Sequence, residues 1–106
     1  MPLLANLISD SLVVQHPFVT GEILAGNPLR RELLSFALRK LPRIEPVEED
    51  AFHDFLEAER LWGTGLGFVD IHLVAAAAGV GQTMIWTNDR RMLNQTGRMN
   101  LAYRPA

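Results

Sequence analysis

The sequence contains no cysteine and very little lysine. Among its 106 residues Lys40 is the only lysine. The absence of cysteine excludes disulfides, thiolate metal sites and cysteine nucleophiles. The start, Met1 to Asn6, lacks the basic segment of a signal peptide, and no stretch reaches the roughly 18 apolar residues that a membrane span needs. We therefore expect a cytoplasmic protein that makes no contact with a membrane.

Neither sign of charge is in large excess. The 10 basic and 12 acidic residues give a net charge of -2, which does not attract nucleic acid to the protein as a whole. The hydrophobic fraction of 48% and the charged fraction of 21% are typical of a folded globular protein. The length predicts a single domain over residues 1–106. Any contact with nucleic acid must then depend on a local basic patch or on a metal.

Apolar residues recur at helical spacing in several segments of the chain. The expected helices are a first one through Leu3 to Leu12, a short one through Val19 and Ile23, and others at about 29–41, 48–59, 69–78 and 90–95. Short apolar segments at 43–47, 83–87 and 101–103 are candidate strands. Helices that alternate with short apolar strands favour an α/β fold with a largely parallel sheet.

Three carboxylates fall beside apolar positions of this pattern. Glu22 follows Phe18 by four residues, and Asp70 precedes Leu73 by three, so each lies on the apolar side of its expected helix. Asp89 follows the candidate strand 83–87, at the end of a strand where α/β proteins bind ligands. The pattern thus predicts that all three acids face inward.

Burial of an unpaired carboxylate is costly, because desolvation disfavours its charged form. With few internal cations in the sequence, a divalent metal ion is one way to compensate the three acids. Oxygen ligands without cysteine or a histidine pair favour Mg²⁺ or Mn²⁺ over zinc. Simpler interpretations stay open: Asp70 as a first-turn acid, Asp89 as a helix N-cap, and Glu22 paired with Arg30 or Arg31.

Three segments resemble the PIN domains of the VapC toxin family. They are HPFVTGEI at 16–23, WGTGLGFVDIHL at 62–73 and IWTNDRRML at 85–93. They occur in the order found in that family, and the similarity runs from about Leu3 to Tyr103. Together they identify the chain as similar to a VapC-type PIN domain.

The resemblance implies a PIN-like three-layer sandwich and a metal-dependent endoribonuclease. Such an enzyme is the toxin of a toxin–antitoxin pair, a homodimer silenced by a VapB-type antitoxin, and uses Mg²⁺ or Mn²⁺ on an RNA substrate. Glu22, Asp70 and Asp89 carry over as metal ligands or as residues that orient metal-bound water, and Thr87 as a catalytic hydroxyl that donates or accepts a hydrogen bond. Arg90 and Arg91, beside Asp89, are candidate contacts to RNA phosphates.

The chain departs from the family at its N-terminus. PIN domains open with an apolar strand that ends in an aspartate, usually followed by two hydroxyl residues. No such strand precedes Met1, and Asp10 does not match that aspartate. We therefore expect a PIN-like domain whose N-terminal strand is missing. Residues 1–106 alone should then be marginally stable, oligomeric or strand-swapped, with weak metal binding and little ribonuclease activity.

Two other functions fit parts of the sequence. One is a non-catalytic module, derived from a PIN domain, that binds an antitoxin or dimerises with a toxin. The other is a receiver-like phosphoacceptor domain, which requires a lysine after a late strand, whereas Lys40 lies mid-chain in an expected helix.

Near Asp70, the glycines of 63–67 are expected to let the chain turn sharply. Trp62 is a candidate for stacking on bases, and Trp86 is expected in the core.

Overall fold

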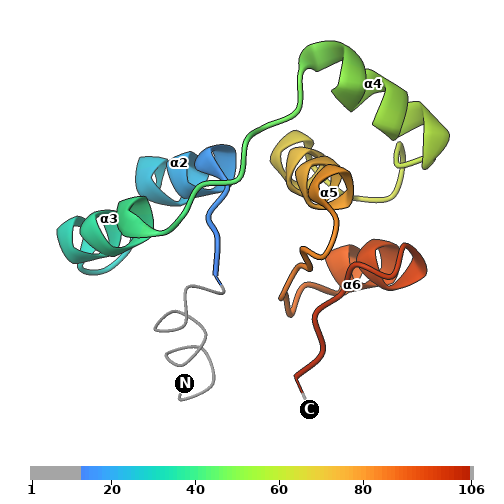
Figure 1. The fold of residues 1–106 in the computed structure, drawn as a ribbon. Coiled ribbons are helices and arrows are strands. Elements are labelled where there is room, and N and C mark those ends of the chain that lie inside the picture. Colours follow the sequence, from blue (N-terminus) through green and yellow to red (C-terminus); the bar gives the residue numbers. More distant parts are fainter. Residues whose placement is uncertain (1–12, 106) are drawn as a thin grey trace. The chain divides into compact units, whose positions relative to one another are not determined.

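The structure is a computed structural model that describes residues 13–105. It divides into two compact units, residues 1–45 and 46–106. The first contains α2 (Pro17–Ala25) and α3 (Arg31–Lys40), and the second contains α4 (Glu49–Ala58), α5 (Phe68–Val80) and α6 (Arg90–Arg98) (Figure 1). None of these helices is long and apolar enough to cross a membrane. The helix expected through Leu3 to Leu12 lies outside the described residues.

The parallel sheet of the expected α/β fold is absent from residues 13–105. The prediction of a PIN-like three-layer sandwich is therefore wrong for this structure, which is helical. Two isolated parallel bridges stand in place of the expected strands, one between Gln15 and Arg43 and one between Ile85 and Ala102. The segments are extended at these points, but neither pairing grows into a ladder.

Prolines end the first bridge in both directions. Gln15 N–H donates to Pro42 O at 2.8 Å, and Ile44 N–H donates to Gln15 O at 2.9 Å. In a parallel ladder the next step would use the N–H groups of residues 17 and 46. Both are prolines and have no N–H to donate, and the preceding step would need the N–H of Pro42. The pairing is thus limited to a single residue on each segment.

The second bridge is limited in a similar way. Ile85 N–H donates to Leu101 O at 2.7 Å, and Tyr103 N–H donates to Ile85 O at 2.9 Å. The next step would need an N–H at Pro105. The preceding step would need the N–H of Leu101, which instead donates to Thr96 O at 2.7 Å where α6 ends. The apolar segment 83–87 therefore does not become the expected strand.

The first unit is a helical hairpin of α2 and α3 (Figure 1). Pro17 occupies the first turn of α2, and the His16 side chain accepts a hydrogen bond from Phe18 N–H at 3.1 Å. After the turn, Arg31 Nε donates to Leu24 O at 2.8 Å and ties the two helices together. Both helices fall where the apolar spacing predicts them, although α3 has no buried residue.

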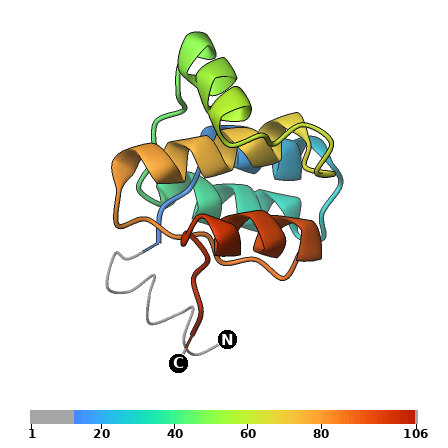
Figure 2. The same cartoon turned by 90° about the vertical axis from the view of Figure 1, so that its right-hand side faces the viewer.

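The core of the second unit forms around α5. Figures 1 and 2 both show α6 beside α5 in this unit. Val74 and Ala77 of α5 pack with Ile85 and with Met92 of α6. A second cluster joins α4 and α5 through the buried residues Phe52, Leu61 and Ile71. Phe55, Leu66 and Met99 contact both clusters, so that the two form one continuous core.

His72 of α5 is buried in an aromatic cluster. Its ring stacks on Phe52 of α4, with centroids 4.3 Å apart and planes 20° apart, and meets Phe68 edge-on at 4.6 Å. Burial lowers the pKa of His72 from its usual value of 6.5. The native structure therefore holds a neutral imidazole between α4 and α5.

The buried His72 predicts a loss of stability in acid. Because the unfolded chain takes up this proton near pH 6.5 and the native chain does so only at lower pH, the free energy of unfolding falls as pH drops below 6.5. His72→Phe keeps the aromatic packing and should flatten this dependence in urea unfolding between about pH 7.5 and pH 5.5. His53→Gln, which changes an exposed imidazole of α4, is the control. An unchanged pH slope in His72→Phe would contradict the prediction.

Candidate functional site

Asp70 lies in the first turn of α5. Its Oδ2 accepts a hydrogen bond from Gly67 N–H at 3.1 Å. Gly67 is the N-cap and has no side chain to return the bond, so this half of a capping box is the contact that orients the Asp70 carboxylate. The chain reaches this turn through Gly63 and Gly65, whose φ values of 72° and 89° favour glycine. The expected sharp turn before Asp70 is confirmed.

Asp89 is the N-cap of α6. Its Oδ1 accepts a hydrogen bond from Met92 N–H at 3.0 Å, which confirms the N-cap interpretation. The hydroxyl oxygen of Thr87 accepts a hydrogen bond from Asp89 N–H at 3.0 Å. Thr87 therefore holds the backbone of Asp89 in place.

Each of these carboxylates keeps one oxygen without a hydrogen bond within residues 13–105. These oxygens are Asp70 Oδ1 and Asp89 Oδ2. Mg²⁺ is commonly held by one or two carboxylates together with waters and substrate phosphates, so each of the two acids has an oxygen of the type that such an ion binds. Across residues 13–105 no group of three or more His, Cys, Asp or Glu residues is placed to hold a metal.

The glycine-rich loop before Asp70 touches the start of α6. A Cβ on Gly65 would lie 2.7 Å from Cδ of Arg91, so the arginine side chain lies directly against the loop backbone. Leu66 packs against the cluster that contains Met92. These contacts bring the approach to Asp70 against the first turn of α6, which Asp89 caps. Arg91 and its neighbour Arg90 are exposed at this end of the unit.

Glu22 is exposed on α2 in the first unit. It forms no ion pair with Arg30 or Arg31, and the guanidinium of Arg31 donates instead to Leu24 O. Asp89 is also exposed and Asp70 is half-buried, so the prediction that all three acids face inward is wrong. Helical spacing identifies the residues that share a face. Burial depends on whether another segment covers that face.

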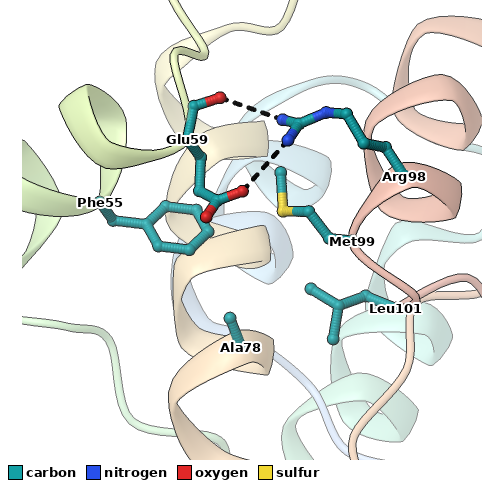
Figure 3. Close-up of a pocket in the computed structure, with 6 residues that line it drawn as sticks. All are labelled: Phe55, Glu59, Ala78, Arg98, Met99 and Leu101. Atoms are coloured by element: carbon teal, nitrogen blue, oxygen red, sulfur yellow. Dashed lines mark hydrogen bonds and ion pairs between the residues drawn. The ribbon is translucent and has the colours of Figure 1, made fainter.

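Two cavities formed by residues 13–105 are lined by residues other than the predicted site residues. One of about 280 Å³ lies in the second unit and is lined by Phe55, Glu59, Ala78, Arg98, Met99 and Leu101 (Figure 3). Ala78 is about 12 Å along α5 from Asp70, at 1.5 Å per residue. The other, of about 450 Å³, is a hollow at the start of α3 lined by residues 30–33. Neither of these two cavities is lined by Glu22, Asp70 or Asp89.

An ion pair at the first cavity could not be found from the sequence. Arg98 of α6 contacts Glu59 Oε1 at 3.2 Å and donates to Glu59 O at 3.0 Å (Figure 3). The two residues are 39 positions apart, so no local spacing pattern predicts the pair. Arg98 thereby satisfies a carbonyl at the end of α4 and joins it to α6.

Comparison with known proteins finds similarity to a curated ribonuclease. The chain is 34% identical over 89 residues to Ribonuclease VapC32 of Mycobacterium tuberculosis strain CDC 1551 / Oshkosh, and equally to that of strain ATCC 25618 / H37Rv. The match covers 84% of this chain and 72% of the relative. No family model matches the chain, and no solved structure matches it.

The backbone conformations of Gly65 and Gly21 predict opposite effects of an alanine substitution on the free energy of unfolding. Gly65→Ala should lower the free energy of unfolding by about 1–2 kcal/mol, because alanine is strained at a φ of 89°. Gly21→Ala should raise it by about 0.5–1 kcal/mol, because Gly21 lies inside α2 and a methyl group there would meet nothing within 4 Å. Chemical unfolding measures both. Equal effects of one sign would contradict this description of the loop.

Proposed function

This chain belongs to the VapC family of PIN-domain ribonucleases, and from that premise we propose that it is a metal-dependent endoribonuclease and the toxin of a toxin–antitoxin pair. The observation that supports the proposal most directly is the state of two carboxylates. Asp70 and Asp89 are each oriented by a backbone N–H through one oxygen, and each offers its second oxygen for ligation. Both lie in segments that resemble the VapC motifs.

We propose that Asp70 and Asp89 hold Mg²⁺ or Mn²⁺. Such an ion supplies Lewis-acid stabilisation of the charge that develops at a phosphodiester and lowers the pKa of bound water. The chain's own contribution is orientation: Gly67 N–H holds Asp70, while Met92 N–H and the Thr87 hydroxyl hold Asp89. The resemblance assigns Glu22 a ligand role as well, and this remains a prediction.

Arginines beside these acids suit the proposed RNA substrate. Arg90 and Arg91 are exposed, and within residues 13–105 neither forms an ion pair with a carboxylate. Guanidinium groups in this state can contact RNA phosphates. We propose that they position the substrate, and that a VapB-type antitoxin silences the enzyme in the cytoplasm.

A non-catalytic module is the second candidate. The observation in its favour is that no group of three metal-binding residues is present in residues 13–105. In that case the chain would bind an antitoxin or a toxin protomer and would not cleave RNA. Measurement of cleavage and of antitoxin binding on the same preparation separates the two functions.

The sequence predicts little ribonuclease activity for residues 1–106, and the proposed function predicts that the activity present depends on metal and is removed by Asp70→Asn and by Asp89→Asn. Asparagine keeps an oxygen that can accept the capping hydrogen bond, so these variants lose a charged ligand while the helix ends stay capped. Loss of several kcal/mol of charge stabilisation corresponds to a rate loss on the order of 10²-fold or more. The measurement is cleavage of a labelled RNA with Mg²⁺ or Mn²⁺ and with EDTA.

Asp54→Asn, which alters an exposed acid of α4, is the matched control and should cleave like the parent. Glu22→Gln in the same assay tests the role that the resemblance assigns to Glu22. Cleavage that persists in EDTA, or in Asp70→Asn, would contradict the metal mechanism. Antitoxin binding without cleavage by the parent would select the non-catalytic module.

We also propose that the chain forms a homodimer through α3. Leu29, just before α3, is 92% exposed, and Leu33 and Phe36 within it are 55% and 62% exposed. Leu33 and Phe36 are three positions apart and so lie along one side of α3, as in helices that pack against a partner. A second copy of the chain supplies the same surface and so satisfies the symmetry of a dimer.

The dimer predicts that Leu33→Glu produces a monomer. A charge placed on each of two facing helices is both desolvated and repelled by its symmetry mate. Analytical ultracentrifugation of the parent should give a dimer that dissociates on dilution, and Leu33→Glu should remain monomeric. Glu32→Gln, a neighbouring change of an exposed acid, should behave like the parent. A parent that is monomeric at every concentration would contradict the proposal.

A further inference from the structure

Two aromatic side chains are exposed at the ends of the loop that precedes α5. Trp62 is 56% exposed and Phe68 is 61% exposed. Elsewhere in residues 46–105 the aromatic rings are covered: Phe52 is buried, and Trp86 is half-buried against Tyr103 at a centroid distance of 5.2 Å. Among the phenylalanine, tryptophan and tyrosine rings of residues 46–105, the exposed ones are therefore the two where the chain approaches Asp70.

The backbone beside Trp62 is anchored. Leu61 is fully buried, its N–H donates to Leu56 O at 3.1 Å, and its carbonyl accepts from the Thr64 hydroxyl at 2.7 Å. Leu66 packs into both core clusters. Because Leu61 and Leu66 occupy the core on either side, the loop has a defined path that leaves the indole of Trp62 outside.

Phe68 is supported from within the unit and still presents most of its ring. It contacts Phe52 with centroids 5.0 Å apart and His72 with centroids 4.6 Å apart. These contacts restrict the orientation of a ring that is 61% exposed. A ring held in this way loses little further freedom when a flat partner stacks on it.

Arg91 of α6 contacts the same loop. The side chain of Arg91 rests on Gly65, midway between the two aromatic residues, and its Nε would be 3.2 Å from a Cβ placed on that glycine. Arg91 takes part in none of the ion pairs within residues 13–105. Exposed aromatic rings beside unpaired guanidinium groups are the combination with which proteins bind single-stranded nucleic acid, through stacking and phosphate contacts.

A protein partner fits this surface less well. The other exposed large apolar residues of 46–105 are Val80 and Met84, at and beyond the far end of α5. Val80 is about 18 Å from Phe68 along the helix, at 1.5 Å per residue. The two aromatic residues thus flank a loop that Arg91 contacts and are not part of a wide apolar patch of the kind that protein interfaces bury.

We propose that Trp62 and Phe68 stack on unpaired bases of a single-stranded RNA segment while Arg91 contacts its phosphates. The inference rests on the proposed ribonuclease function, and adds to it the residues that select unpaired nucleotides. Stacking in this position would place a phosphodiester next to the loop that leads into α5, whose first turn contains Asp70. Duplex RNA does not offer its bases to such a surface, so discrimination between single and double strands follows from it.

The test is RNA binding by Trp62 variants of the full chain. All proteins carry Asp70→Asn to prevent cleavage, and the ligands are a fluorescently labelled single strand of about 12 nucleotides, its duplex, and the same strand with abasic sites. Trp62→Ala should weaken single-strand binding roughly tenfold, whereas Trp62→Phe should retain most of the affinity. Trp86→Phe is the matched control and should bind like the parent.

Two readouts separate stacking from a structural role. The abasic strand should bind Trp62→Ala and the parent equally, and thermal melting of Trp62→Ala should match that of the parent. Equal affinity of the two proteins for the intact single strand would overturn the inference. So would an equal loss on the abasic strand, or a change in self-association without a change in RNA affinity.

Failure of the proposed function has a different result. If the parent without Asp70→Asn neither cleaves nor binds any RNA, the ribonuclease proposal is wrong, and the stacking inference falls with it. If the parent cleaves RNA in a metal-dependent reaction and Trp62→Ala binds single strands with parental affinity, the inference alone is wrong.

Discussion

The burial of α5 is the interaction on which the second unit depends. A helix of 13 residues is marginal by itself in water, so its stability comes from the side chains packed around it. Val74 is completely buried, and Ala75, Ala76 and Ala77 are nearly so. Small side chains let neighbouring segments approach the helix closely. The apolar core around α5 is completed by Ile85, by Met92 of α6 and by the core residues of α4.

The candidate site is a consequence of this packing. Leu61 and Leu66 belong to the same core, and they determine the path of the loop between α4 and α5. That loop leads directly into the first turn of α5, which contains Asp70, and it lies against Arg91 of α6. Because helix N-termini favour negative charge, a carboxylate there is stabilised before any ligand binds. The cap uses one carboxylate oxygen and leaves the other without a hydrogen bond within residues 13–105.

Local features of the chain were predicted well from the sequence. The expected helices at 29–41, 48–59, 69–78 and 90–95 correspond to α3, α4, α5 and α6. Pro17 begins α2 and Asp89 caps α6, both as their residue types indicate. The strands were not predicted correctly, because apolar character identifies an extended segment but does not show which segment it pairs with, or at which residues. Likewise, helical spacing predicted that Glu22 faces inward, and the end of a candidate strand predicted the same for Asp89. Both carboxylates are exposed.

The sequence by itself determined which segments form α2 to α6 and which ribonuclease family the chain belongs to. These properties depend on neighbouring residues: caps, prolines, apolar spacing and short motifs act within one or two turns of chain. The tertiary structure decided which faces are covered, why Trp62 remains outside, and that Arg91 rests on Gly65. It also decided that Arg98 joins Glu59. The physical reason is that burial and side-chain contacts form between segments that are distant in sequence. Local patterns of residues do not show which of these segments pack together.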